Sequence, residues 1–253
     1  MHMRTTNNTI LIVGGTSGIG RALAETFFTR GNKVIIAGRR QTLLDEIANC
    51  HPGIYSVRLD VQDAASVARA AEEVRSRFPE LNVLIANAGI SRSEDMKSDD
   101  WDTSVAEQVV QTNILGVLRV VSAFLPQLKA KRDAAIMATS SALAFVPRAD
   151  FPTYCASKAF LHSWLQSLRH QLKHFPVEVL ELSPPYVQSE LTGPQQASDP
   201  RAMPLPEFVA EVLRILESAD HSRGEILLPR DLPRRWAERD GRYDEIFAAQ
   251  NPS

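Results

Sequence analysis

The sequence is poor in cysteine and contains no long apolar run. Only Cys50 and Cys155 occur among its 253 residues. Two cysteines are too few for a disulfide framework and are typical of a reducing compartment. No apolar stretch approaches the ~18 residues of a membrane span, and the chain does not open with a signal-peptide pattern. We therefore expect a cytoplasmic protein without a membrane partner.

The sequence also has no excess of either charge. Lys and Arg number 28 against 30 Asp and Glu, which leaves a formal net charge of −2. This balance provides no electrostatic reason to expect nucleic acid as a partner. No internal repeat, low-complexity tract or interdomain linker is evident. With 44% hydrophobic and 23% charged residues, residues 1–253 are expected to form one globular domain.

Short apolar runs alternate with longer amphipathic stretches, which is the pattern of βα units around a parallel sheet. The predicted strands are 9–14, 33–38, 54–60, 81–87, 134–140, 177–183 and 225–229, with helices at 102–129, 152–174 and 206–218 among others. The fold class is therefore α/β, a single-domain Rossmann fold with a doubly wound parallel seven-stranded sheet. Prolines between the last two strands predict a lid at about 188–218. Residues 230–253 form an extension, in which 234–250 is predicted to be one amphipathic helix.

A glycine turn follows the first predicted strand and opens the first helix. Its spacing is G-x-x-x-G-x-G over residues 14–20. Such a turn lets the backbone approach a pyrophosphate, and the helix N-terminus attracts its charge. We expect a dinucleotide held by Gly14, Thr16, Ser17, Gly18, Ile19 and Gly20. The alternative is a plain βα turn. Asp60 and Val61, at the end of the third strand, are placed to meet the adenine edge.

The end of the second predicted strand carries Arg39 and Arg40 and no carboxylate before Asp45. An acidic residue here would bind the adenosine ribose, whereas an arginine would accept a 2′-phosphate. The sequence therefore predicts NADP(H) as the preferred cofactor, with NAD(H) possible. Arg39 is the expected main contact and Arg40 assists. The alternative is that both arginines are solvated surface charges.

Tyr154 and Lys158 lie one helical turn apart, just after Pro152. Their side chains should share a helix face. A nearby ammonium and the N-terminal end of a helix both favour a phenolate, so the pair is expected to lower the pKa of Tyr154 for acid/base work. Tyrosine and lysine at this spacing also occur without any function. Ser140 and Ser141 at the end of the preceding strand favour a site, because ligands bind at that edge of an open sheet.

These motifs together resemble the short-chain dehydrogenase/reductase (SDR) family over nearly the whole chain, and the first half resembles its bacterial DltE-like oxidoreductases. The matching features are the glycine turn, Asn113, Ser141 thirteen residues before Tyr154, and Lys158. The resemblance implies that Tyr154 is the acid/base and that Lys158 lowers its pKa and contacts the nicotinamide ribose. It also implies that Ser141 holds the substrate oxygen and that Asn113 supports a proton relay. Further cofactor contacts implied in the same way are Asn87, Ala88, Gly89, Pro184, Val187 and Ser189.

Three positions depart from the family pattern. Val13 replaces a usual threonine and Ala86 replaces an asparagine, so two hydrogen bonds that brace the cofactor loop are expected to be absent. Pro185 replaces a glycine and should stiffen its segment. None of the three is a reacting group.

The resemblance implies an NADPH-dependent carbonyl or alcohol oxidoreductase that assembles as a homodimer or homotetramer. The alternative is a non-catalytic NADP-binding sensor or scaffold on the same fold. No metal is expected, because His170 and His174 lack a third ligand. The predicted substrate walls are Phe145, Val146, Pro147 and Phe151 with residues 191–203. Their largely apolar character suggests a medium-sized small-molecule ketone, aldehyde or alcohol.

Overall fold

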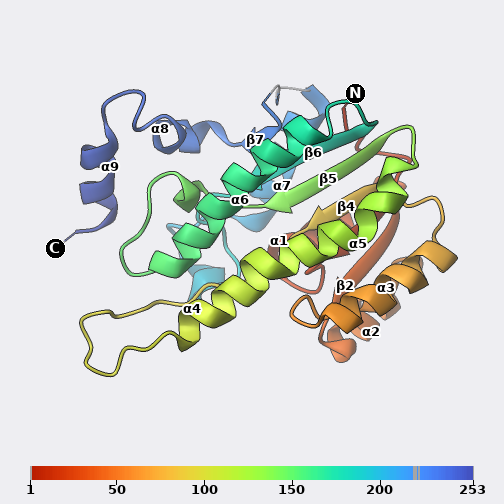
Figure 1. Ribbon diagram of the computed structural model, residues 1–253, viewed down its shortest axis with the longest axis horizontal. Coiled ribbons are helices and arrows are strands. Elements are labelled where there is room, and N and C mark those ends of the chain that lie inside the picture. Colours follow the sequence, from red (N-terminus) through yellow and green to blue (C-terminus); the bar gives the residue numbers. More distant parts are fainter. Residues whose placement is uncertain (1, 219–220, 222, 253) are drawn as a thin grey trace.

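The structure is a computed structural model that describes residues 2–218, 221 and 223–252. Its centre is one parallel sheet in the order β3-β2-β1-β4-β5-β6-β7 (Figure 1). Every neighbouring pair of strands is parallel. The strands are β1 (Thr9–Val13), β2 (Lys33–Gly38), β3 (Tyr55–Arg58), β4 (Val83–Ala86), β5 (Ala134–Thr139), β6 (Val177–Ser183) and β7 (Glu225–Leu227). The predicted seven-stranded doubly wound fold is confirmed, with β3, β4 and β7 shorter than expected.

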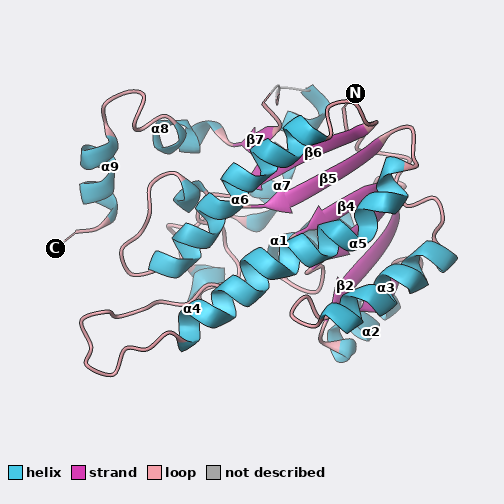
Figure 2. Ribbon diagram, viewed as in Figure 1, coloured by secondary structure: helices cyan, strands magenta, loops and turns pink. Residues whose placement is uncertain are grey.

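Helices cover both faces of the sheet (Figure 2). Alternate residues of a strand point to opposite faces, so Leu11 and Val13 belong to one core cluster and Ile10 and Ile12 to the other. The first face packs against α3 (Ala64–Arg77), α5 (Val117–Lys129) and α6 (Pro152–Gln171). The second packs against α1 (Gly18–Thr29), α2 (Gln41–Cys50) and α7 (Leu205–Ser218). Burial on both faces explains why the strands are nearly uniformly apolar.

Local sequence signals set several helix ends. Asp63 caps α3, because its carboxylate accepts a hydrogen bond from the Ala65 amide at 2.8 Å. Gly31, at φ +79, follows the end of α1 and donates its amide to the Phe28 carbonyl at 3.0 Å. A positive φ at this position favours glycine. The helix predicted to carry Tyr154 and Lys158, α6, begins at Pro152.

The long helix predicted at 102–129 runs from Ser104 to Lys129, but its hydrogen bonding is not α-helical throughout. Between α4 (Ser104–Val109) and α5 lies a π-helix, η1 (Val110–Gly116). At Gly116 a Cβ atom would lie 2.8 Å from the side chain of Val61, so a larger residue would collide with the segment after β3. Hydrophobic periodicity does not reveal this close approach of Gly116 to Val61, so the sequence pattern did not predict the irregular turn. π-helical turns often occur at functional sites.

The same helix qualifies the expectation that no segment could span a membrane. Among the residues described, Ser104–Lys129 is long and apolar enough to do so by length and composition. Its apolar residues Val117, Val120, Val121 and Phe124 are buried in the core cluster that covers the sheet. Core packing therefore accounts for the apolar character of this helix.

The lid and the C-terminal extension differ from their predicted forms. Phe208 and Val212 of α7 are fully buried in the core, so α7 belongs to the helix layer that covers the sheet. The segment that we call the lid is therefore limited to residues 188–204. The lid also contains a 3₁₀ turn, η3 (Pro194–Ser198). The single helix predicted at 234–250 is wrong. The extension instead has η4 (Pro229–Asp231), α8 (Leu232–Arg235) and α9 (Tyr243–Gln250), and α9 turns away from α8 (Figure 1). Gly241, at φ +66, interrupts the helix.

Candidate active site

A cavity of about 360 Å³ opens at the carboxyl ends of the strands. The chain runs outward from β1 to β3 and then crosses to β4, so this edge includes the topological switch point at which open α/β sheets bind ligands. Of the predicted site residues, those that line the cavity are Gly14, Thr16, Ser17, Gly18, Ile19, Arg39, Arg40, Val61, Asn87, Ala88, Gly89, Ser141, Tyr154, Lys158, Pro184, Val187 and Ser189. Gly20, Asp60 and Asn113 are not among the lining residues.

The glycine turn forms a backbone cradle at the N-terminus of α1. Gly14 and Gly18 have φ values of +84 and +51. A Cβ on Gly14 would lie 2.7 Å from the Ala88 backbone, and one on Gly20 would lie 2.1 Å from the Gly14 carbonyl oxygen. Gly20 therefore acts behind the cavity, where it permits close packing. The amides at a helix N-terminus suit a phosphate group, so the cradle fits a dinucleotide.

Asn87 braces this turn. Its backbone amide donates to the Val13 carbonyl at 2.9 Å, and its side-chain amide donates to the Gly14 carbonyl at 3.2 Å. Its amide oxygen accepts a hydrogen bond from the Thr139 hydroxyl at 3.0 Å. Asn87 and Thr139 thus support the loop although Val13 and Ala86 have no polar side chains. Thr139 was not predicted, and its position next to Ser140 and Ser141 at the strand end is the only sequence signal that could have found it.

The two arginines after β2 differ in their surroundings. Arg40 donates from Nη2 to the hydroxyls of Thr16 and Ser17, at 3.2 and 3.1 Å. Arg39 is exposed, lines the cavity, and makes no hydrogen bond or ion pair within the described part of the chain. Asp60 does not join them, because its carboxylate accepts the Gln62 amide at 3.0 Å and caps its own turn. Leu59, Val61 and Gln62 line the cavity there instead.

Tyr154, Ser141 and Lys158 meet at the inner end of the cavity. Tyr154 is the third residue of α6 and Lys158 lies one turn later, both almost completely buried. The Lys158 ammonium donates to the Thr139 carbonyl at 2.8 Å and lies 5.7 Å from the centre of the Tyr154 ring. Ser141 follows β5 and caps the 3₁₀ turn η2 (Ala142–Ala144) by accepting the Leu143 amide. Two segments, α6 and the turn after β5, therefore place a phenol, an ammonium and a hydroxyl around one region.

Burial dominates the ionisation of this group. It raises the pKa of Tyr154 to about 12, although the neighbouring Ser141 hydroxyl opposes the rise. Burial also lowers the pKa of Lys158 to about 8, against the opposing effect of the Glu181 carboxylate. The expected lowering of the Tyr154 pKa is therefore wrong for the ligand-free chain, since removing the phenolate from water outweighs the effect of the Ser141 hydroxyl. At neutral pH Tyr154 is a protonated phenol.

Asn113 lies in η1 and is completely buried. Its amide oxygen accepts the Ile90 amide at 2.9 Å, and its nitrogen donates to the Ile90 carbonyl at 2.9 Å and the Ser157 hydroxyl at 3.1 Å. A methyl group on Gly89 would lie 3.4 Å from Asn113 Oδ1 and 3.5 Å from Lys158 Nζ. The side chain thus holds the segment after β4 beside Lys158, and its part in a proton relay stays a prediction.

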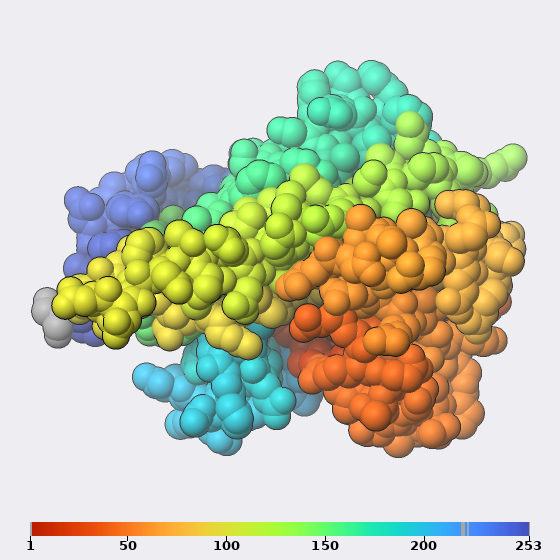
Figure 3. Space-filling model, turned by 60° about the horizontal axis from the view of Figure 1, so that its bottom comes forward, coloured from red at the N-terminus to blue at the C-terminus, as the bar shows by residue number. Residues whose placement is uncertain are grey.

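A second cavity of about 360 Å³ adjoins the first. Both are lined by Ser141, Tyr154, Pro184, Pro185, Leu191 and Gln196. Of the predicted walls, Phe151, Leu191, Thr192, Gln196 and Arg201 line it. Phe145, Val146 and Pro147 do not. The lid, cyan in Figure 3, projects from this side of the molecule beside the yellow segment that follows β4. The walls remain largely apolar, but they also include four arginines, which the sequence analysis did not predict as a group.

Comparison with known proteins assigns the family. Residues 8–200 match the model of the short chain dehydrogenase family. The chain belongs to this family of oxidoreductases. It is 36% identical over 251 residues to an uncharacterized oxidoreductase, DltE, of Bacillus subtilis, covering 98% of each chain.

Solved structures share the fold. A short chain dehydrogenase from Burkholderia cenocepacia in complex with NADP has a TM-score of 0.81 at 24% identity, covering 99% of this chain and 100% of that one. A 3-ketoacyl-(acyl-carrier-protein) reductase from Brucella melitensis complexed with NADH has a TM-score of 0.74 at 23% identity, covering 90% and 93%.

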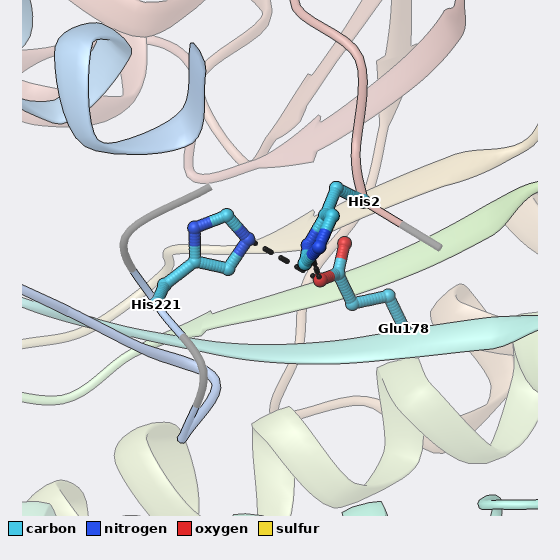
Figure 4. Close-up of side chains that lie close together, drawn as sticks. All are labelled: His2, Glu178 and His221. Atoms are coloured by element: carbon cyan, nitrogen blue, oxygen red, sulfur yellow. Dashed lines mark hydrogen bonds and ion pairs between the residues drawn. The ribbon is translucent and has the colours of Figure 1, made fainter. Parts of the chain in front are cut away.

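A cluster that was not predicted lies away from the cavity. His2 Nδ1 and His221 Nε2 are each 3.3 Å from Glu178 Oε1 (Figure 4). Glu178 is the second residue of β6 and therefore lies near the strand's amino end, opposite the site. The three residues come from distant parts of the sequence, so no spacing could reveal them. Their position gives them no contact with the reacting groups.

Proposed function

We propose that this protein is an NADPH-dependent oxidoreductase that interconverts a small-molecule carbonyl compound and the corresponding alcohol. The observation that carries the proposal is the meeting of the two cavities at Tyr154 and Ser141. One cavity contains the phosphate-binding glycine turn and the other offers room for a substrate. A carbonyl at the junction would therefore lie beside both the cofactor site and a buried phenol.

The dinucleotide fits the first cavity by the chemistry of its lining. The cradle at Gly14 to Ile19 would bind the pyrophosphate, and Lys158 and Tyr154 would hold the ribose next to the nicotinamide. When bound, the nicotinamide supplies the hydride that reduces the carbonyl carbon. The chain supplies binding, orientation and protonation.

Tyr154 is the proposed proton donor in reduction. Its phenol is protonated at neutral pH, so it can donate a hydrogen bond and then a proton to the carbonyl oxygen. The Ser141 hydroxyl would donate a second hydrogen bond to the same oxygen and stabilise its developing negative charge. The Lys158 ammonium, close to the ring of Tyr154, favours the phenolate that remains. Burial excludes water and strengthens each of these interactions.

Arg39 and Arg40 support NADPH as the preferred form. Arg39 has its guanidinium exposed at the cavity, and Arg40 is held beside it by Thr16 and Ser17. No acidic residue from the ends of β2 and β3 lines this part of the described cavity. A phosphate between two guanidinium groups would form charge-assisted hydrogen bonds, whereas a ribose diol would not use their charge.

The test is a steady-state assay of the purified protein with NADPH and NADH against a panel of carbonyls and alcohols. We expect turnover with NADPH, and a Tyr154→Phe variant should lose about 10²- to 10⁴-fold in kcat. NADPH titration should give nearly the wild-type affinity for that variant, because Lys158 and the glycine turn still line the cofactor cavity. Binding of NADPH without turnover of any panel member would favour the non-catalytic sensor or scaffold instead.

A further inference from the structure

The second cavity differs from an ordinary apolar substrate pocket in its charge. Its walls include Arg148, Arg201, Arg230 and Arg234, and of the described residues that line it none is acidic. The four arginines come from three segments: the loop before α6, the lid, and the C-terminal extension. Because the four arginines come from separate segments, they are not simply the solvated face of one helix. The fold therefore concentrates positive charge where the substrate is expected to lie.

Three of these arginines are anchored by carboxylates but keep free donors. Arg148 uses Nε and Nη2 on Asp150, at 2.9 and 2.5 Å. Arg201 uses the same two nitrogens on Asp199, at 3.0 and 2.7 Å for the closest contacts. In each case Nη1 makes no hydrogen bond to any described residue. A guanidinium has five N–H donors, so an anchored arginine can still bind a second oxyanion.

Arg234 is fixed most firmly. Its Nη1 donates to Asp231 Oδ1 at 2.9 Å and its Nε donates to the Gln250 side chain at 2.8 Å. Asp231 is completely buried, and its second oxygen makes no hydrogen bond within the described chain. Burial of a carboxylate is costly. A buried acid behind an arginine at a cavity wall indicates that the position of this guanidinium matters.

The extension itself is tied to the loop before the catalytic helix. Gln250 donates to the Val146 carbonyl at 2.8 Å, and Asn251 donates to the Pro147 carbonyl at 3.1 Å. Asn251 also accepts the Ala149 amide at 2.7 Å. These bonds hold the segment that carries Arg230 and Arg234 as a wall of the cavity. Arg230, in η4, is exposed at the wall and makes no hydrogen bond or ion pair with any described residue, although its charge acts through space on the neighbouring Asp231 carboxylate.

We propose that this cavity selects carbonyl substrates that carry an oxyanion, with Arg230 and Arg234 of the C-terminal extension as specificity-determining residues. The proposal rests on the oxidoreductase function above and names its substrate class. An anionic group at these arginines would orient the substrate so that its carbonyl reaches Tyr154 and Ser141, which line the same cavity. Guanidinium forks suit carboxylate and phosphate equally, because both present paired oxygens.

The test compares matched substrates: an aldehyde with a terminal carboxylate, its methyl ester, and an aldehyde of equal length with a terminal phosphate. NADPH oxidation gives kcat/KM for each. We expect the wild type to prefer the charged aldehydes over the ester by at least about 10-fold, mainly through KM. In Arg230→Gln the charged-to-ester ratio should fall about 10- to 100-fold, the usual effect of losing a charged hydrogen bond. The carboxylate and phosphate arms identify which oxyanion fits.

Arg239→Gln is the matched control, because Arg239 is exposed, pairs with Asp240 and does not line the cavity. It should keep the wild-type ratio. Arg230 makes no hydrogen bond or ion pair in the described structure, so Arg230→Gln should melt close to the wild-type temperature. A wild type that reduces the ester as efficiently as the carboxylate, or an Arg230→Gln variant with an unchanged ratio, overturns the proposal.

A binding measurement separates failure of this inference from failure of the proposed function. If no aldehyde is reduced, the carboxylate is titrated calorimetrically into the NADPH-loaded protein. Saturable binding that Arg230→Gln abolishes supports the oxyanion site even though the reaction assignment has failed. Absence of binding in the wild type refutes the oxyanion site.

Discussion

Lys158 is a buried cation, and burying its charge lowers the stability of the folded protein. Among the described residues, its ammonium donates a hydrogen bond to the Thr139 carbonyl at 2.8 Å. Burial lowers its pKa from 10.5 to about 8. Below pH 8 both the folded and the unfolded chain carry the proton, so the penalty for burying the charge is present in full. Between about pH 8 and 10.5 only the unfolded chain carries it, so stability rises with pH in this window. The penalty corresponds to roughly 3 kcal/mol.

Lys158→Met should therefore stabilise the ligand-free protein at pH 7 while abolishing its activity. Loss of the bond to Thr139 offsets about 1 kcal/mol, which leaves an expected gain of about 1–2 kcal/mol. The gain should shrink as the pH rises to 9.5. Urea unfolding at both pH values measures it, with the exposed Lys173→Met as the control. A variant less stable than the wild type at pH 7 would contradict the burial argument.

Arg39 is the residue on which the proposed preference for NADPH depends. Because it is exposed and has no described partner, its removal should not disturb the fold. In Arg39→Ala we expect the KM for NADPH to rise about 10- to 100-fold, as for loss of a charged hydrogen bond. The KM for NADH serves as the internal control and should change little. Equal changes for the two cofactors would mean that Arg39 does not contact the 2′-phosphate.

At the scale of elements, the buried side chain of Gln196 links several parts of the lid. Gln196 donates to the Val187 carbonyl at 2.7 Å, and its oxygen accepts hydrogen bonds from the Thr192 amide and hydroxyl at 2.9 and 2.8 Å. The lid has no long helix or strand of its own, and a backbone bridge joins Val187 to Met203 across its base. The shape of the lid over both cavities therefore depends on Gln196 more than on regular structure.

Gln196→Ala should loosen the lid and raise the substrate KM by about 10-fold, because a buried carbonyl and two lid donors lose their partner. Hydrogen exchange over residues 188–204 should become faster, which a role limited to substrate contact would not cause. The adjacent Gln195 is exposed, so Gln195→Ala is the matched control. Unchanged exchange in Gln196→Ala would show that the lid is held by other contacts.

At the scale of the whole molecule, the cofactor site joins parts of the chain that are distant in sequence. Its walls come from the ends of β1, β2, β4 and β5, from α6 and from the lid. A ligand that binds all of these segments binds only the folded state. Such a ligand stabilises the whole fold by mass action.

NADPH at about a hundred times its Kd should stabilise the protein by about 2.7 kcal/mol. For a chain of this size that corresponds to a rise in Tm of roughly 5–10 °C. NADH at the same concentration should give a smaller rise. Thermal unfolding followed by circular dichroism measures both. No shift with either nucleotide would contradict the assignment of the cavity, and a larger shift with NADH would contradict the NADPH preference.

The sequence by itself determined the fold class, the glycine turn, the Tyr154–Lys158 pair and the family. These features are local, because apolar periodicity, glycine spacing and helical spacing act over a few residues. The starts of α6 and α3 were predictable for the same reason, since Pro152 and Asp63 act on the adjacent backbone, whereas α6 ends at Gln171 and not at the predicted residue 174. Strands that are buried on both faces of a sheet have nearly continuous apolar sequences, so they too could be recognised from the sequence.

Only the tertiary structure decided the features that depend on contacts between distant segments. It committed the Asp60 carboxylate to the Gln62 amide and the Asn113 side chain to Ile90 and Ser157. It also divided the predicted C-terminal helix into α8 and α9. It reversed the expected pKa shift of Tyr154, because burial depends on the whole packing around a side chain. It also brought Arg148, Arg201, Arg230 and Arg234 to one cavity. Charges that are scattered along the chain become a binding surface only when the fold places them together.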